Sequence, residues 1–111
     1  MNNNYVEVNP AFFTETIWTE ATPEQKGVLM TLLMSVQSEE TQWEWKEEKM
    51  ILQPGQLLTT LPSLAEQCGK WFTTAKIESV LKRLALDGFL TDEPIGNFRL
   101  ITIKNWGIHF V

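Results

Sequence analysis

Seven polar side chains between residues 70 and 83 have the types and spacing of a nucleic-acid contact. They combine cationic groups with hydroxyl groups, and they are Lys70, Thr73, Thr74, Lys76, Ser79, Lys82 and Arg83. Cationic side chains bind phosphate oxygens, and arginine and hydroxyl side chains also reach base edges. On a helix that starts at Thr73, the last three of these positions lie opposite Ile77. The spacing therefore predicts one helix face that contacts double-stranded DNA.

The position of each side chain suggests its role. Lys82 and Arg83 would contact phosphate or a guanine edge, and the hydroxyl groups would reach bases or phosphates near the helix start. Lys70 would contact the DNA backbone from the preceding turn. Lys76 lies at the edge of the face. An ordinary solvated helix face carries the same residue types, and Glu78 beside it disfavours an anion, so both interpretations stay open.

The tryptophans allow a second nucleic-acid interpretation. Trp43, Trp45, Trp71 and Trp106 could stack on the bases of a single strand. Five glutamates lie between residues 39 and 48 and would repel a phosphate backbone. We therefore expect these rings to pack in the core or in an interface.

Enzymatic and metal chemistry lack their motifs. The sequence contains no phosphate-binding loop, no zinc-protease helix and no hydrolase nucleophile elbow. The single Cys68 and the single His109 cannot form a zinc site, and one cysteine forbids an internal disulfide. The adjacent carboxylates at 39–40 and 47–48 lie in a polar stretch that does not suit acid–base catalysis. We expect no enzyme, no metal and no cofactor.

Length and charge limit the remaining classes. A chain of 111 residues fits one domain. The net charge is −5, but residues 1–55 carry nine acidic and three basic residues, whereas 56–111 carry five and six. A surface that faces an anion therefore belongs to the second half. No apolar run approaches the length of a membrane span, and the first residues do not have the pattern of a secretion signal, so we expect a cytoplasmic protein without membrane contact.

The elements of the first half follow from caps and periodicity. An N-terminal arm, residues 1–21, contains a short apolar helix at 10–18 that docks on the core. Thr22 and Gln25 form a capping box for a helix that runs to about Ser38. Its buried face contains Val28, Leu29, Leu32, Leu33 and Val36. A strand follows at 41–46, with Trp43 and Trp45 on one side.

The second half predicts a helix-turn-helix followed by a hairpin. After a turn at 54–55 and an extended segment at 56–60, Ser63 and Glu66 form a second capping box, and Gly69 stops that short helix. Thr73 starts a longer helix with an apolar stripe of Ile77, Val80, Leu81 and Leu84. Strands at 89–92 and 98–103 are joined by a turn near 94–97, where Asp92 and Glu93 would repel phosphate. The predicted fold is α+β, a winged helix-turn-helix over 22–106 with an extra N-terminal helix and a small antiparallel sheet, and 107–111 form a C-terminal end.

Several segments also resemble a known family. They are Gln53 to Thr60, Ser63 to Gly69, Val80 to Leu84, Gly88 to Thr91 and Arg99 to Trp106. Together they resemble the N-terminal winged-helix module of DnaD-type replication initiation proteins, the replisome organisers of Gram-positive phages and prophages. The resemblance covers roughly residues 5–106. It implies binding at a replication origin and recruitment of helicase-loading or other replication proteins.

The long helix at 22–38 carries an apolar surplus outside its core face. Met30 and Met34 lie one turn apart, and with Gln37 they form a second stripe that would suit self-association. Alternatively, the segment around Phe12 and Trp18 folds back and covers the methionines. Two functions therefore compete: a DNA-binding module for replication initiation, and a winged-helix protein-interaction or oligomerisation module with little intrinsic DNA binding.

Overall fold

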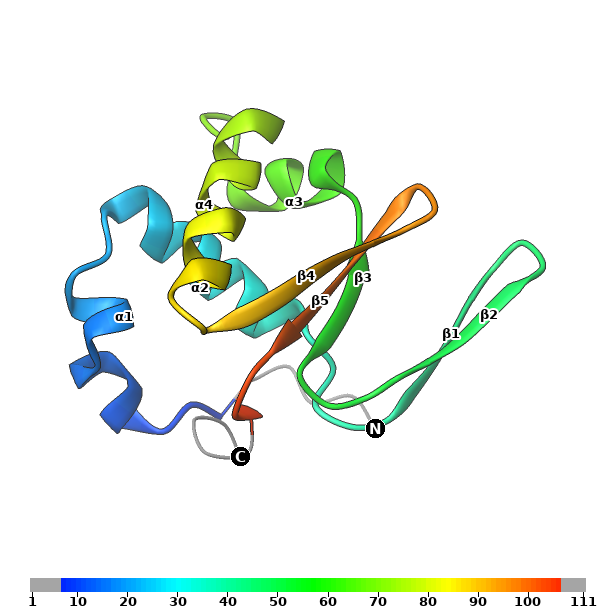
Figure 1. Ribbon diagram of the computed structural model, residues 1–111, viewed down its shortest axis with the longest axis horizontal. Coiled ribbons are helices and arrows are strands. Elements are labelled where there is room, and N and C mark those ends of the chain that lie inside the picture. The colour runs from blue at the N-terminus through cyan, green and yellow to red at the C-terminus, as the bar shows by residue number, and fades with distance from the viewer. Residues whose placement is uncertain (1–6, 107–111) are drawn as a thin grey trace.

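Helices and two small antiparallel sheets alternate along the chain in the computed structural model, which describes residues 7–106 (Figure 1). In chain order the elements are a 3-10 helix Pro10–Thr14, α1 Thr16–Thr19, α2 Pro23–Ser35, β1 Thr41–Trp45, β2 Glu48–Leu52, β3 Gln56–Thr59, α3 Leu61–Cys68, α4 Thr74–Leu86, β4 Leu90–Ile95 and β5 Phe98–Ile103. The predicted α+β class is confirmed.

Helix α2 starts as its sequence predicts and ends earlier. The Thr22 hydroxyl accepts a hydrogen bond from the Gln25 amide at 3.1 Å, and the Gln25 side chain accepts one from the Thr22 amide at 2.9 Å. The helix ends at Ser35 instead of about Ser38. The amide and carbonyl of Gln37 bond instead to the backbone of Gln56 and Gly55, at 3.0 and 2.7 Å. These contacts hold the chain extended after the helix.

Helix α3 does not start at the predicted capping box. Its N-cap is Thr60, whose hydroxyl accepts a hydrogen bond from the Ser63 amide at 3.2 Å. Pro62 lies in the first turn, where proline is favoured because its missing N–H would have no helical partner. The prediction of Ser63 as N-cap was therefore wrong by three residues. Gly69 ends the helix as expected, with a φ of 126° that favours glycine.

The three-stranded sheet has the order β3-β5-β4, with antiparallel neighbours. Strand β4 extends to Ile95, beyond the predicted end at Asp92, and Gly96 and Asn97 form the turn. A φ of 59° at Gly96 suits the first central position of a two-residue hairpin turn. Asp92 therefore lies along the strand and not near the tip, which corrects the sequence prediction.

A second hairpin, β1–β2, was predicted only in its first strand. Trp43 pairs with Met50 and Trp45 with Glu48. Strand β2 is mostly exposed, so it lacks the apolar alternation that identifies a strand in sequence. Both hairpins extend to the same side of the helices in Figure 1. Their tips therefore flank one side of the domain.

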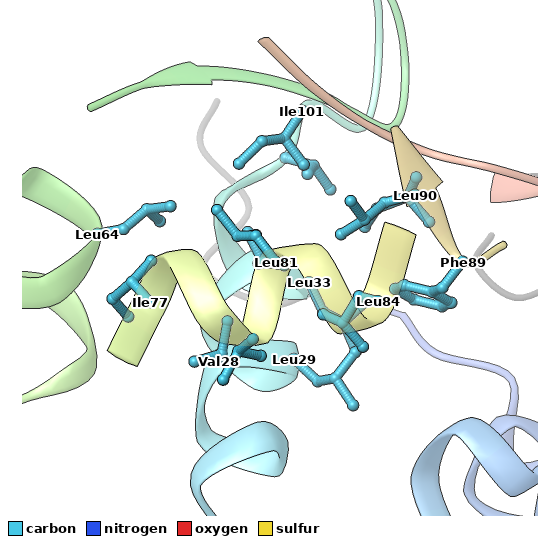
Figure 2. Close-up of a cluster of buried hydrophobic side chains, with 14 of the residues drawn as sticks. Val28, Leu29, Leu33, Leu64, Ile77, Leu81, Leu84, Phe89, Leu90 and Ile101 are labelled. Atoms are coloured by element: carbon cyan, nitrogen blue, oxygen red, sulfur yellow. The ribbon is translucent and has the colours of Figure 1, made fainter. Parts of the chain in front are cut away.

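The core lies between α2, α3, α4 and the three-stranded sheet (Figure 2). The predicted apolar faces of α2 and α4 are both buried, which confirms their orientation. The Phe12 side chain is fully buried, and its ring centroid lies 6.0 Å from those of Trp18 and Phe89. The predicted docking of the N-terminal segment on the core is thereby confirmed.

Candidate nucleic-acid interface

Helix α4 separates a buried face from a polar face. Thr73 is its N-cap, because its hydroxyl accepts a hydrogen bond from the Lys76 amide at 3.2 Å. Ile77 and Leu81 are fully buried, whereas Ser79, Lys82 and Arg83 are exposed. The predicted buried and exposed faces of α4 are therefore confirmed.

Two shallow depressions follow the exposed side of α4. The first is lined by Thr74, Ala75, Glu78, Ser79 and Lys82. The second lies between α4 and the start of α2, and its α4 residues include Lys76, Ser79, Lys82 and Arg83. Ser79 and Lys82 border both depressions. The structure thus brings five of the seven predicted contact residues onto one continuous surface.

Each cationic side chain of α4 already has an acidic neighbour. Three ion pairs join exposed groups: Lys76 Nζ to Glu24 Oε1 at 3.4 Å, Lys82 Nζ to Glu78 Oε1 at 3.6 Å, and Arg83 Nε to Asp87 Oδ2 at 3.2 Å. Exposed pairs of this kind contribute about 0–1 kcal/mol each. A phosphate can therefore replace the carboxylate at small cost, but the acids reduce the net positive charge of the surface.

The turn before α4 adds an aromatic side chain that was predicted to be packed. Trp71 is 77% exposed, so it is not a core residue. The Lys70 ammonium lies 5.3 Å from its ring centroid, and the Lys76 ammonium donates a hydrogen bond to its carbonyl at 3.3 Å. Lys70, Trp71 and Lys76 therefore form one exposed corner at the start of α4.

A partly buried ion pair joins the two strands of the β4–β5 hairpin next to α4. Arg99 donates two hydrogen bonds to Asp92, Nε to Oδ1 at 3.1 Å and Nη2 to Oδ2 at 2.7 Å. Its Nη1 also lies 3.8 Å from Oε2 of Glu78 on α4. The hydrogen bonds to Asp92, against the opposing effect of burial, raise the pKa of the Arg99 guanidinium. The negative charge of Asp92 is thus balanced by Arg99. Of the two acids predicted to repel phosphate, only Glu93 is exposed.

The predicted stripe on α2 is exposed but shorter than expected. Met34 is 69% exposed and Met30 is 36% exposed, so the N-terminal segment does not cover Met34. Gln37 lies beyond the helix, where its backbone bonds to Gly55 and Gln56. The alternative in which the arm covers the stripe is therefore wrong, and Gln37 is not part of a helical stripe.

The remaining candidate residues form no reactive cluster. Among residues 7–106, no group of three or more histidine, cysteine or acidic side chains is arranged to hold a metal. Cys68 is a half-buried free thiol, and His109 lies outside the described residues. In the same range, no helix is long and apolar enough to cross a bilayer.

Comparison with protein families, curated proteins and solved structures found no match for this chain. Fold and surface together define a small α+β domain that presents one polar helix face between a helix and a hairpin.

Proposed function

We propose that this chain binds double-stranded DNA through the exposed face of α4, as a winged helix-turn-helix module. The observation that carries the proposal is the α4 surface itself, where Thr74, Ser79, Lys82 and Arg83 are exposed together above a fully packed opposite face. An exposed helix with cationic and hydroxyl side chains fits the major groove and its flanking phosphates.

The elements around α4 support this assignment. Helix α3 packs against α4 and is joined to it by a short turn, as the first helix of a helix-turn-helix is. In this interpretation the β4–β5 hairpin is the wing, and the contact of Arg99 with Glu78 holds it against α4. After the β1–β2 hairpin the elements follow in the order β3-α3-α4-β4-β5, and the pairing of β3 with β5 gives the wing a small sheet as its base.

A role in replication initiation is the second part of the proposal. It rests on the resemblance of the segments 53–60, 63–69, 80–84, 88–91 and 99–106 to the DnaD-type winged-helix module. We propose accordingly that the partners are origin DNA and helicase-loading or other replication proteins. The DNA surface and the replication role are separable, because the first can be measured on the chain alone.

Salt-dependent duplex binding tests the DNA surface. If Lys70, Lys76, Lys82 and Arg83 neutralise three or four phosphates, log K falls with log salt at a slope near −3, so affinity drops by about 60-fold between 50 and 200 mM salt. Fluorescence anisotropy with a labelled duplex measures both quantities. Replacing Lys82 and Arg83 by alanine is expected to reduce the slope to about −1 and to remove most of the binding.

The control removes the same charge elsewhere. Lys49→Ala with Lys104→Ala deletes two exposed cations outside α4, and this variant is expected to bind DNA nearly as the wild type does. Binding by the Lys82 and Arg83 variant at wild-type strength would contradict the proposal. An equal loss of DNA affinity in both double variants would mean that the binding is nonspecific attraction by net charge.

Self-association is a second candidate function, which the exposure of Met34 favours. An apolar side chain 69% exposed on a helix, with Met30 one turn away, is a flexible contact surface. The two functions are compatible, because the methionines lie on α2 and the DNA surface on α4.

Charge on the methionine stripe is expected to change the mass and not the fold. Met30→Glu with Met34→Glu should convert a dimer or larger oligomer into a folded monomer, since a carboxylate in an apolar interface costs several kcal/mol. Light scattering and circular dichroism measure mass and folding. Leu86→Glu, at an exposed apolar position outside α2, should leave the mass unchanged. A wild type that is monomeric at high micromolar concentration would refute the interface.

A further inference from the structure

An aromatic groove lies between the two hairpins, away from the α4 surface. It has a volume of about 390 Å³, within the roughly 300–1,000 Å³ of ligand pockets. Its lining combines two charged residues, Glu48 and Lys49, with rings and aliphatic side chains. The apolar lining residues are Trp43, Trp45, Met50, Leu58, Ile95 and Phe98. The groove is therefore largely apolar, with one acidic and one basic residue in its lining.

The ring of Phe98 fixes the shape of this groove. Its centroid lies 5.2 Å from that of Trp43 and 5.3 Å from that of Trp45, in edge-to-face geometry at 77° and 76°. Phe98 belongs to β5 and the tryptophans to β1, so these contacts join the two hairpins. Trp45 nevertheless stays 47% exposed. The rings therefore form a preorganised aromatic surface, part of which is exposed to solvent.

Glu48 shares this surface because of the strand register. It pairs with Trp45 across the hairpin, and side chains that are paired across strands lie on the same face. Glu44 alternates with the tryptophans along β1 and lies on the opposite face. Of these two carboxylates, only Glu48 borders the groove.

A cation already lies on one of these rings. The Lys46 ammonium, in the turn of the same hairpin, is 4.5 Å from the ring centroid of Trp45. Tryptophan is the aromatic ring that binds cations best, and such a contact contributes about 0.5–1 kcal/mol at exposed sites. This internal contact shows which charge the aromatic surface accepts.

The net negative charge on and just before the β1–β2 hairpin also favours a cationic ligand. The hairpin carries three exposed acids, Glu44, Glu47 and Glu48, against two lysines, Lys46 and Lys49, and two more exposed acids, Glu39 and Glu40, directly precede it. Within residues 7–106, none of these carboxylates takes part in an ion pair. A nucleic-acid backbone would be repelled, whereas a basic segment would be attracted.

We propose that the groove between the hairpins docks a basic, extended segment of a protein partner. An arginine or lysine of that segment lies on the Trp43, Trp45 and Phe98 rings beside the Glu48 carboxylate, and neighbouring apolar side chains contact Met50 and Ile95. This site goes beyond the proposed DNA binding and uses none of the α4 residues, so each can fail without the other.

A model peptide tests the site on the full chain. The probe is an acetylated and amidated hexapeptide that alternates arginine and leucine, and the indole N–H signals of Trp43 and Trp45 report its binding by NMR titration. Glu48→Gln is expected to weaken the peptide by about fivefold, the effect of about 1 kcal/mol. Glu44→Gln removes the same charge from the opposite face and should change affinity by less than about twofold.

Further probes distinguish other occupants. A hexapeptide that alternates glutamate and leucine should not bind, and a ten-nucleotide thymidine strand should leave both indole signals unchanged. The alanine variant of Lys82 and Arg83 should bind the arginine peptide as the wild type does. Equal effects of Glu48→Gln and Glu44→Gln, binding of the glutamate peptide, or stronger binding of the thymidine strand would each overturn the proposal.

Discussion

Leu81→Ala is expected to lower the free energy of unfolding by about 2–5 kcal/mol, the range for a buried leucine truncated to alanine. Leu81 is fully buried on α4 and belongs to the same cluster as Leu33 and Ile101 (Figure 2). Truncation leaves a cavity between α2, α4 and the sheet, because close-packed neighbours relax only in part. Urea denaturation followed by circular dichroism measures the change.

The matched control lies on the other face of the same helix. Ser79 is exposed, and Ser79→Ala should change the free energy of unfolding by less than about 0.5 kcal/mol. Similar small changes in both variants would mean that α4 does not pack through Leu81. A large loss in Ser79→Ala with none in Leu81→Ala would mean that the helix is rotated.

The two long helices were predictable because local signals agree there. On α4, the Thr73 cap, the apolar stripe and the positive φ of Gly88 after the helix all lie within one short segment. On α2, the capping box at Thr22 gave the start correctly. The end was missed because the Gln37 amide donates a hydrogen bond to Gln56 and the Gly55 amide donates one to the Gln37 carbonyl. These bonds compete with another helical turn, and contacts between residues so far apart in sequence leave no local pattern.

Other elements could not be derived from local patterns. Strand β2 is identified by its pairing with β1, since its own residues are largely exposed. The start of α3 was misassigned because Thr60 and Ser63 are both good N-cap residues, and only the backbone at Thr60 adopts the extended cap conformation. Sequence preference alone does not separate two such neighbours.

The sequence predicted which face of α4 is exposed, but it did not predict the ion pairs that its cationic side chains form. Periodicity placed Ser79, Lys82 and Arg83 opposite the core, which depends only on helical geometry. The pairing of Lys76 with Glu24 joins α4 to α2 and depends on how the two helices pack. The exposure of Trp71 likewise depends on the path of the turn. Tertiary contacts therefore determine how much of the predicted positive charge is free for an anion.

Arg99→Met is expected to destabilise the domain by about 3 kcal/mol. It removes the partner of Asp92, whose side chain is only 8% exposed, while that of Arg99 is 25% exposed. A buried carboxylate without its cation costs about 3–5 kcal/mol in related pairs, and the partial exposure of Arg99 places this case at the lower end. Urea denaturation provides the measurement, and Arg83→Met removes an exposed arginine as a control with an expected change below about 1 kcal/mol.

A double variant separates the loss of a charge from the loss of packing. Arg99→Met with Asp92→Leu replaces both partners by apolar groups, and such replacements are often neutral or stabilising. Its stability should therefore exceed that of Arg99→Met and approach the wild type. If both variants lose the same stability, the Arg99 stem and not its charge supports the hairpin. If Arg99→Met alone loses less than about 0.5 kcal/mol, then the contacts of Arg99 with Asp92 and with Glu78 do not stabilise the position of the β4–β5 hairpin against α4.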